Sequence, residues 1–361
     1  MDEHRRTIDA AAAAIRPPDA AARDAARALQ LRLTKPAGAL ARLEDLHVWA
    51  AGVLRDATPA PPRKLIAVAA ADHGVAIEGV SAYPQDVTAQ MVANFLAGGA
   101  AVNVLASHAG ALVRVVDAGV RGKLTDARLH VARTRGGTDS MTRGPAMSRD
   151  EAATLVARGV EFARAAAAEG FGAIALGDMG IGNTTAAAAV TAVLAGAPPR
   201  VTTGRGTGVD DAAYARKLAA VERAIAINAP DAADAIDVLA KVGGFEIAFL
   251  AGVAIGAAAS GAILVLDGYP TTAAALVAAG VAPPSVDYML TSHQSAEPGH
   301  RVALQHLGLR PLLDLEMRLG EGTGAALAMT LLDAALRIPR EMATFDSAGV
   351  SHGDHETQPE A

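Results

Sequence analysis

The sequence predicts an α/β protein built on an open, doubly wound parallel sheet of six strands. Six short apolar runs recur along the chain, each followed by a glycine-rich or polar loop and then by a helical stretch. Strands that alternate with helices are typical of a parallel sheet with crossover helices. Six such runs favour an open sheet over an eight-stranded barrel. The runs are residues 65–72, 112–117, 173–178, 262–267, 287–291 and 312–317.

The composition indicates a globular enzyme and excludes several other classes. The chain has 361 residues, of which 51% are hydrophobic and 19% charged, so it can bury a large core in one large or two modest domains. A net charge of -6 and an aromatic content of 3% provide neither a basic surface nor stacking platforms, so we expect no nucleic-acid partner. The sequence contains no cysteine, which excludes disulfides, thiolate metal sites and cysteine nucleophiles.

The two ends of the chain are predicted to be mainly helical. Residues 1–56 have a helical pattern that is interrupted at 33–40, where a proline and a glycine indicate a turn between helices. A proline-rich linker then leads into the main domain. In the polar tail, His352 and His355 are more typical of a solvated terminus than of a metal site.

Neither a signal peptide nor a membrane helix is expected. The chain start lacks the continuous apolar region of a signal peptide, so a cytoplasmic location is predicted. Residues 247–266 are uncharged over a length that spans a bilayer. They are rich in alanine and glycine and have no flanking lysine or arginine cluster, so we interpret them as a buried helix followed by a buried strand.

Polar side chains gather at the carboxyl ends of the apolar runs. One such residue is often only a helix cap. Several on one edge predict a ligand site, because ligands of open α/β sheets bind at the carboxyl ends of the strands. These residues are Asp72, His73, Asp117, Asp178, Asp267, His293 and Glu321.

Two glycine-rich loops are candidates for binding an anion. Residues 177–185 match neither the Walker sequence nor the G-x-G-x-x-G fingerprint, and they form either a tight structural turn or a phosphate site at a helix N-terminus. Residues 203–211 precede a helix that carries Arg216 and Lys217. These two side chains either reach an anion or are ordinary surface charges.

A third loop, at 318–324, places Glu321 between two glycines before an apolar helix. Burial raises the pKa of a carboxyl group and suits it to accept a proton near neutral pH. The other interpretation is that Glu321 complements the dipole of the helix. The histidines, including His293 and His300, have no metal-ligand spacing on one helix, and hydrogen bonding to a substrate fits that pair better.

Eight motifs, taken in order, resemble the nicotinate-nucleotide:dimethylbenzimidazole phosphoribosyltransferase family, often called CobT. The resemblance covers nearly the whole chain. The motifs are LTKPAGAL at 33–40, ADHGV at 71–75, GVSAYPQDVTAQMVANF at 79–95, GDMGIGNTT at 177–185, GRGTG at 204–208, LDGYPTT at 266–272, SHQSAEPGH at 292–300 and RLGEGTGA at 318–325.

The resemblance implies a cytoplasmic homodimer that needs no metal or cofactor. Its fold would be a Rossmann-like, six-stranded parallel sheet in a catalytic domain at 57–330, with a small helical domain formed by 1–56 and 331–361. The implied reaction transfers phosphoribose from nicotinate mononucleotide to 5,6-dimethylbenzimidazole. The products are α-ribazole 5′-phosphate, for the lower ligand of cobalamin, and nicotinate.

The resemblance also implies roles for individual residues. Glu321 matches the general base of the family, and Asp178 stands where the family usually has glutamate, so its carboxylate orients ribose or aglycone with a shorter reach. The benzimidazole pocket falls on Ser81, Gln90, Met179 and Leu319. The nucleotide site falls on Gly180, Gly182, Asn183, Thr184, Gly206, Lys217, Asp267, Gly268 and Ser295. Ala37 and Ala39 replace the usual proline and serine of the first motif, a minor departure.

Two alternatives stay open at the level of sequence. The first is the same transfer onto another base or a phenolic acceptor, because one methyl group at a pocket edge discriminates by only ~1–3 kcal/mol. The second is a non-catalytic nucleotide-binding regulator with the same fold, against which the presence of Glu321 speaks.

Overall fold

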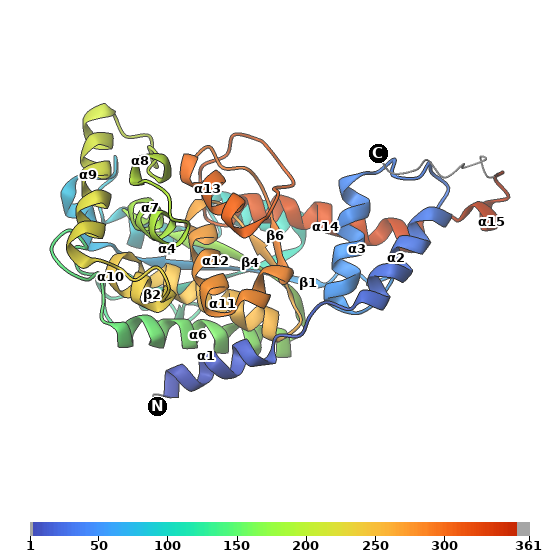
Figure 1. The fold of residues 1–361 in the computed structure, drawn as a ribbon, viewed down its shortest axis with the longest axis horizontal. Coiled ribbons are helices and arrows are strands. Elements are labelled where there is room, and N and C mark those ends of the chain that lie inside the picture. The colour runs from blue at the N-terminus through green and yellow to red at the C-terminus, as the bar shows by residue number, and fades with distance from the viewer. Residues whose placement is uncertain (1–2, 352–361) are drawn as a thin grey trace. The chain divides into compact units, whose positions relative to one another are not determined.

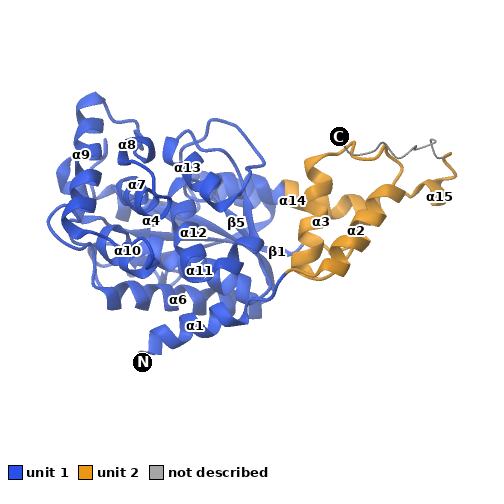
Figure 2. Cartoon of the chain, in the orientation of Figure 1, with its two compact units in different colours: residues 1–17, 62–330 blue, residues 18–61, 331–361 orange. Residues whose placement is uncertain are grey.

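A computed structural model describes residues 3–351 and divides the chain into two compact units (Figure 2). The larger unit contains residues 1–17 and 62–330, and the smaller contains 18–61 and 331–361. We had expected residues 1–17 in the small domain. They belong to the larger unit because α1 (Glu3–Ala14) buries Ile8 and Ala11 in the core and packs against helices α6 and α11. His352 and His355 lie outside the described residues.

The larger unit is built on one six-stranded sheet, in which every neighbouring pair is parallel (Figure 1). This confirms the predicted fold class. The strand order is β3-β2-β1-β4-β5-β6, so the direction of winding reverses between β1 and β4, which is where such sheets bind ligands. The strands are β1 (Arg63–Ala71), β2 (Ala111–Gly119), β3 (His130–Val131), β4 (Phe171–Met179), β5 (Ile263–Leu266) and β6 (Met289–Thr291).

One predicted strand was wrong and one was missed. Residues 312–317 form only an isolated bridge, between Leu313 and His293, and Leu315 is 54% exposed, so this segment is not a strand of the sheet. The sixth strand is instead β3, two residues that pair with the end of β2. Val131 at this edge is exposed, and so short an exposed strand leaves no apolar run in the sequence.

Helices cover both faces of the sheet, which explains the continuous apolar runs. Along β1, Leu65 and Ala67 belong to the core cluster with α6 and α11, whereas Ile66 points the other way. A Cβ on Gly322 would lie close to both Ile66 and Val102 of α5, so the intervening positions of β1 face α5. The helices between the strands are α4 (Val87–Ala97), α5 (Ala101–Ala109), α6 (Arg149–Ala168), α7 (Asn183–Leu194), α8 (Pro199–Thr202), α9 (Asp211–Asn228), α10 (Ala235–Val242), α11 (Phe245–Ala259) and α12 (Tyr269–Val281).

Small residues let α6 and α11 pack closely. A Cβ on Gly252 would lie 1.9 Å from the carbonyl oxygen of Val156, so the two backbones meet where only glycine fits. The buried α11 followed by β5 confirms our interpretation of residues 247–266. The remaining elements are the short helices η1 (Gly74–Glu78) and η2 (Pro283–Tyr288), together with α13 (Pro298–Leu307) and α14 (Thr323–Glu341).

One helical segment, Val87–Ala109, is long and apolar enough to cross a membrane by length and composition alone. Gly98, with a φ of 82°, divides it into α4 and α5. At a rise of about 1.5 Å per residue, neither helix reaches the roughly 30 Å of a hydrocarbon core.

The smaller unit contains α2 (Ala20–Arg32), α3 (Arg42–Leu54), the end of α14 and α15 (Phe345–Ala348). The predicted turn at 33–40 connects α2 to α3, with Gly38 at a φ of 73°. Lys35 in this turn forms a buried 2.7 Å ion pair with Glu44. An isolated bridge between Leu33 and Thr344 ties the turn to the C-terminal segment of the same unit.

Candidate active site

A cavity of about 110 Å³ lies at the carboxyl end of the sheet, among the loops that follow β4, β5 and β6. Nine of the predicted site residues line it, although they come from five separate motifs. They are Asp178, Met179, Gly180, Asn183, Thr184, Gly206, Gly268, Ser295 and Leu319.

The loop from β4 to α7 forms one wall of the cavity. Asn183 Nδ2 donates a 2.8 Å hydrogen bond to Asp178 Oδ2, while Asp178 Oδ1 is buried without a partner among the described residues. Burial, together with the nearby Asp267 and Glu246 carboxylates, raises the pKa of Asp178 well above its usual value. Gly180 is needed because a Cβ there would lie 2.4 Å from the carbonyl oxygen of Ala71. This wall therefore contains a buried carboxyl oxygen that has no partner among the described residues.

A buried lysine lies behind the second glycine loop. Lys217 Nζ donates a 2.8 Å hydrogen bond to Thr184 Oγ1 and lies as close to the place that a Cβ on Gly206 would take. The side chain is fully buried, which overturns its interpretation as a surface charge, and burial lowers its pKa to about 8. Glu297 closes the same corner, because its Oε1 accepts a 2.7 Å hydrogen bond from the Gly206 N–H. The corner thus combines a buried cation, a hydroxyl and a carboxylate.

Glu321 lies next to the cavity rather than on its wall. Its neighbours Leu319 and Gly320 line the cavity, whereas its own carboxylate accepts a hydrogen bond from the backbone N–H of Val102 in the first turn of α5. The side chain is 5% exposed, and its Oε2 has no partner within residues 3–351. Burial raises the pKa of Glu321 and outweighs the Val102 hydrogen bond, which lowers it. Glu321 is thus a shielded carboxyl group in a left-handed conformation, with a φ of 65°.

Asp267 anchors the loop that carries Glu321. Its carboxylate accepts hydrogen bonds from the backbone N–H groups of Gly322 at 3.0 Å and Ala325 at 2.9 Å, at the start of α14. Burial raises the pKa of Asp267 to about 7, although these N–H groups lower it. The structure therefore shows a structural use for this carboxylate, and its nucleotide contact stays a prediction.

The other predicted residues lie around the cavity at different depths. Lys217, Asp267 and Glu321 are behind its wall, and Gly182 caps α7 with a φ of 95°. Ser81 Oγ lies 3.4 Å from Thr207 Oγ1, a cavity-lining atom of the second glycine loop. Gln90 is exposed on α4 and is not among the residues that line the cavity.

Several residues of the cavity were not singled out from the sequence. Glu297 lies within the 292–300 motif, but its contact with Gly206, 91 residues away, has no local signal. Thr207, Tyr269 and Arg318 also line the cavity and likewise sit inside recognised motifs. Below the β4–α7 loop, His73 Nε2 lies 2.7 Å from Glu246 Oε1 in a fully buried pair, and no sequence signal pointed to Glu246.

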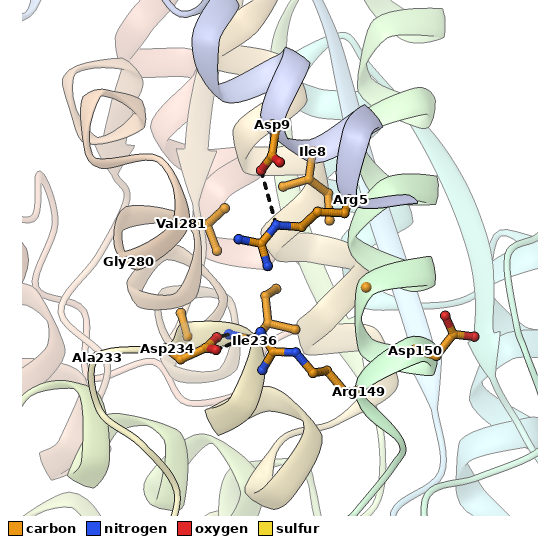
Figure 3. Close-up of a pocket in the computed structure, with 12 residues that line it drawn as sticks. Arg5, Ile8, Asp9, Arg149, Asp150, Ala233, Asp234, Ile236, Gly280 and Val281 are labelled. Atoms are coloured by element: carbon orange, nitrogen blue, oxygen red, sulfur yellow. Dashed lines mark hydrogen bonds and ion pairs between the residues drawn. The ribbon is translucent and has the colours of Figure 1, made fainter. Parts of the chain in front are cut away.

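A second, larger cavity has a different character (Figure 3). It holds about 670 Å³ between α1, α6, α10 and α12. Its two arginines are already paired, Arg5 with Asp9 at 3.4 Å and Arg149 with Asp234 at 2.6 Å. Because both arginines are already paired with carboxylates, this groove is a weaker candidate for a ligand site than the smaller cavity at the end of the sheet. Within the described part of the chain, no three His, Asp or Glu side chains are grouped to hold a metal ion.

A cavity at the carboxyl edge of the sheet, with a buried cation and shielded carboxyl groups beside it, indicates the class of protein: an α/β enzyme that binds a small polar ligand. The chain belongs, more particularly, to a phosphoribosyltransferase family, whose pattern matches residues 15–350. It is therefore an enzyme of the pentosyltransferase class, which confirms the resemblance drawn from the motifs.

Individual relatives agree over almost the whole chain. A protein of Desulforudis audaxviator named nicotinate-nucleotide–dimethylbenzimidazole phosphoribosyltransferase is 53% identical over 357 residues, which cover 99% of this chain and 100% of that relative. A protein of the same name from Chloroflexus aggregans is 52% identical over 338 residues, 93% of this chain and 96% of its own length. The chain in a crystal structure titled nicotinate-nucleotide-dimethylbenzimidazole phosphoribosyltransferase from Thermus thermophilus is 49% identical to this chain, with a TM-score of 0.88 over 93% of this chain and 100% of that one.

Proposed function

We propose that this enzyme transfers phosphoribose from nicotinate mononucleotide to 5,6-dimethylbenzimidazole, with Glu321 as the general base. The observation that carries the proposal is the Glu321 carboxyl group, which is buried, has a raised pKa and keeps one oxygen without a partner among the described residues. A base with a pKa raised towards neutrality suits the removal of a proton from a weakly acidic ring nitrogen. The names of the relatives supply the two substrates.

In the proposed reaction, one ring nitrogen of dimethylbenzimidazole attacks the anomeric carbon of the nucleotide. Its electron pair forms the new N–C bond, and the bond from that carbon to nicotinate breaks on the opposite face. The breaking pair neutralises the pyridinium nitrogen, so the leaving group needs no acid. The proton on the other benzimidazole nitrogen passes to the Glu321 carboxylate. The products are α-ribazole 5′-phosphate and nicotinate.

The remaining catalytic power would come from positioning. Holding two reactants in an attack geometry contributes ~7–11 kcal/mol in favourable cases. Lys217, Thr184 and the 204–208 loop would hold the phosphate, in keeping with the buried cation and hydroxyl found there. Met179 and Leu319, with Ser81 and Gln90, would receive the flat base. Leu319 lines the cavity and is 57% exposed, so its side chain is accessible to such a base.

We also infer that the enzyme acts in the cytoplasm as a homodimer. The first inference is supported by the lack of cysteine and the second by the family to which the chain belongs. The sedimentation coefficient of the purified protein tests the dimer directly, because a monomer of 36.4 kDa sediments more slowly.

Glu321→Gln tests the assignment of the base. Glutamine keeps the shape of the side chain and can still accept the Val102 hydrogen bond, but it cannot take a proton. We expect kcat to fall by ~10²–10⁴-fold, the usual contribution of a general base. The affinity for nicotinate mononucleotide should stay near that of the wild type. Product formation is followed by chromatography of α-ribazole phosphate, and affinity by calorimetry.

Glu316→Gln is the matched control. Glu316 also has a left-handed backbone, with a φ of 55°, but it is exposed and does not line the cavity. This control should keep full activity. A wild-type protein that forms no product would refute the enzyme assignment. Loss of nucleotide affinity with preserved turnover in Glu321→Gln would refute the base assignment. Product formed only with a different base or a phenol would revise the acceptor alone.

A further inference from the structure

His293 faces the cavity, and the proposed reaction gives it no role. It lies two residues after β6, is 1% exposed and lines the cavity with Gly268. A Cβ on Gly268 would lie 3.8 Å from Cε1 and 3.9 Å from Nε2 of this ring. The Cε1–Nε2 edge is therefore turned towards the cavity wall that Gly268 forms.

The hydrogen bonds of Ser292 determine which nitrogen of His293 carries the proton. Ser292 Oγ lies 3.0 Å from the carbonyl oxygen of Asp267, which can only accept, so the single hydroxyl proton points there. The same Oγ lies 3.0 Å from His293 Nδ1 and must therefore accept from it. Asp267 Oδ1, 3.9 Å from Nδ1, favours the same arrangement. His293 is thus protonated on Nδ1.

The other nitrogen, Nε2, then carries a free electron pair. Burial lowers the pKa of His293, so the ring is neutral at physiological pH and does not gain a second proton. Within residues 3–351, the polar contacts of this ring are made at Nδ1. The ring thus offers the cavity a fixed acceptor whose orientation is set by Ser292 and Asp267.

We propose that His293 Nε2 accepts a hydrogen bond from a ribose hydroxyl of the nucleotide substrate. This inference rests on the proposed function. The phosphate and the carboxylate of nicotinate mononucleotide are acceptors at neutral pH, and its ring nitrogen carries no hydrogen. Its only donors are therefore the 2′- and 3′-hydroxyls, and an acceptor nitrogen can bind no other part of it.

The polar groups around the cavity lie in two separate places. Lys217 and Thr184 provide donors behind the 204–208 loop, whereas His293 lies against Gly268, in another part of the cavity wall. A nucleotide whose phosphate lies against these donors leaves its ribose to be bound by another part of the wall, such as His293.

A cycle of variants and ligands tests the contact. Asparagine at this position reproduces Nδ1 but lacks the outer nitrogen, whereas the glutamine amide reaches the place of Nε2 and supplies an acceptor. For His293→Asn we expect affinity for nicotinate mononucleotide to fall about three- to tenfold, the effect of one neutral hydrogen bond. One of the two deoxy analogues, 2′ or 3′, should bind this variant and the wild type equally. His293→Gln should recover part of the loss.

Each outcome is decisive when binding is measured by calorimetry. If His293→Asn lowers the affinity for the nucleotide and for both deoxy analogues by the same factor, the proposed contact is wrong. It is also wrong if the variant lowers the affinity for none of them. If the wild type does not bind nicotinate mononucleotide at all, the proposed function itself fails. If the asparagine variant does not fold, nitrogen NMR of wild-type histidines, with the His293 signal assigned from its absence in His293→Gln, gives the answer. An Nδ1–H tautomer whose Nε2 signal shifts on nucleotide addition supports the contact, and an Nε2–H tautomer or an unshifted signal overturns it.

Discussion

Replacing Gly177 by alanine should disturb catalysis through the backbone of Glu321. Gly177 lies in β4, one residue before Asp178, and a Cβ there would be 2.4 Å from the carbonyl oxygen of Glu321 and 2.7 Å from its carbonyl carbon. Ordinary contacts begin near 3.4 Å, so the 320–322 loop must retreat by about 1 Å. The loop cannot yield freely, because Asp267 holds Gly322 and Ala325 on the other side.

The expected size of the effect follows from this displacement. A misplacement of about 1 Å can cost ~10²-fold in rate, so we expect kcat to fall by about two orders of magnitude. Overpacking costs ~1–3 kcal/mol of unfolding free energy, offset in part by ~0.5–1 kcal/mol from replacing glycine in a strand. Nucleotide affinity should change little, because Thr184 and Lys217 are untouched. Steady-state kinetics, calorimetry and urea unfolding measure the three quantities.

Gly144→Ala is the matched control, because a Cβ at Gly144 meets no atom within 4 Å and its φ is not positive. This variant should behave as the wild type in all three measurements. If Gly177→Ala keeps both its kcat and its unfolding free energy, the close approach of β4 to the Glu321 loop does not constrain catalysis, and the reasoning is refuted.

Two further predictions concern titration and charge. The kcat of the wild type should fall as the pH decreases through the pKa of Glu321, because the base must be ionised; burial raises this pKa, so the acidic limb should lie above the ordinary value of 4.5. A limb at or below that pH, measured in a kcat–pH profile, contradicts the assignment. Lys217→Met should lower the affinity for nicotinate mononucleotide by about tenfold or more, since hydrogen bonds to charged groups contribute ~1.5–3 kcal/mol. Its unfolding free energy should stay equal or rise, because the buried ammonium is unfavourable in the native protein; unchanged affinity in calorimetry would remove Lys217 from the site.

The fold class could be predicted because buried parallel strands are continuous apolar runs. Five of the six predicted runs became strands, and the acidic residues at their ends, such as Asp178 and Asp267, lie at the carboxyl edge. The exceptions have a physical cause. The run at 312–317 contains charges and lies exposed beside residues 291–296. Strand β3 is too short to produce a recognisable apolar run in the sequence.

The glycine-rich loops could be recognised from the sequence as candidate sites. The local sequence could not distinguish an anion site from a structural turn, or a ligand-binding charge from a surface charge. Whether Lys217 was a surface charge or a buried cation depended on how α9 packs, and its full burial is a property of the tertiary structure. The same holds for Asp267, whose carboxylate is directed to the start of α14, 55 residues away in the chain.

The sequence by itself therefore determined the α/β class, the edge of the sheet that carries the site and most of the residues around the cavity. The class and the edge follow from local apolar patterns and from glycines that allow close backbone approach, whereas the individual residues around the cavity follow from the resemblance of the motifs to the family. Only the tertiary structure decided the pairing of Glu297 with Gly206, the burial of His73 against Glu246 and the contact of Ser292 with His293. Hydrogen bonds between residues far apart in the chain depend on three-dimensional proximity, which no local pattern encodes.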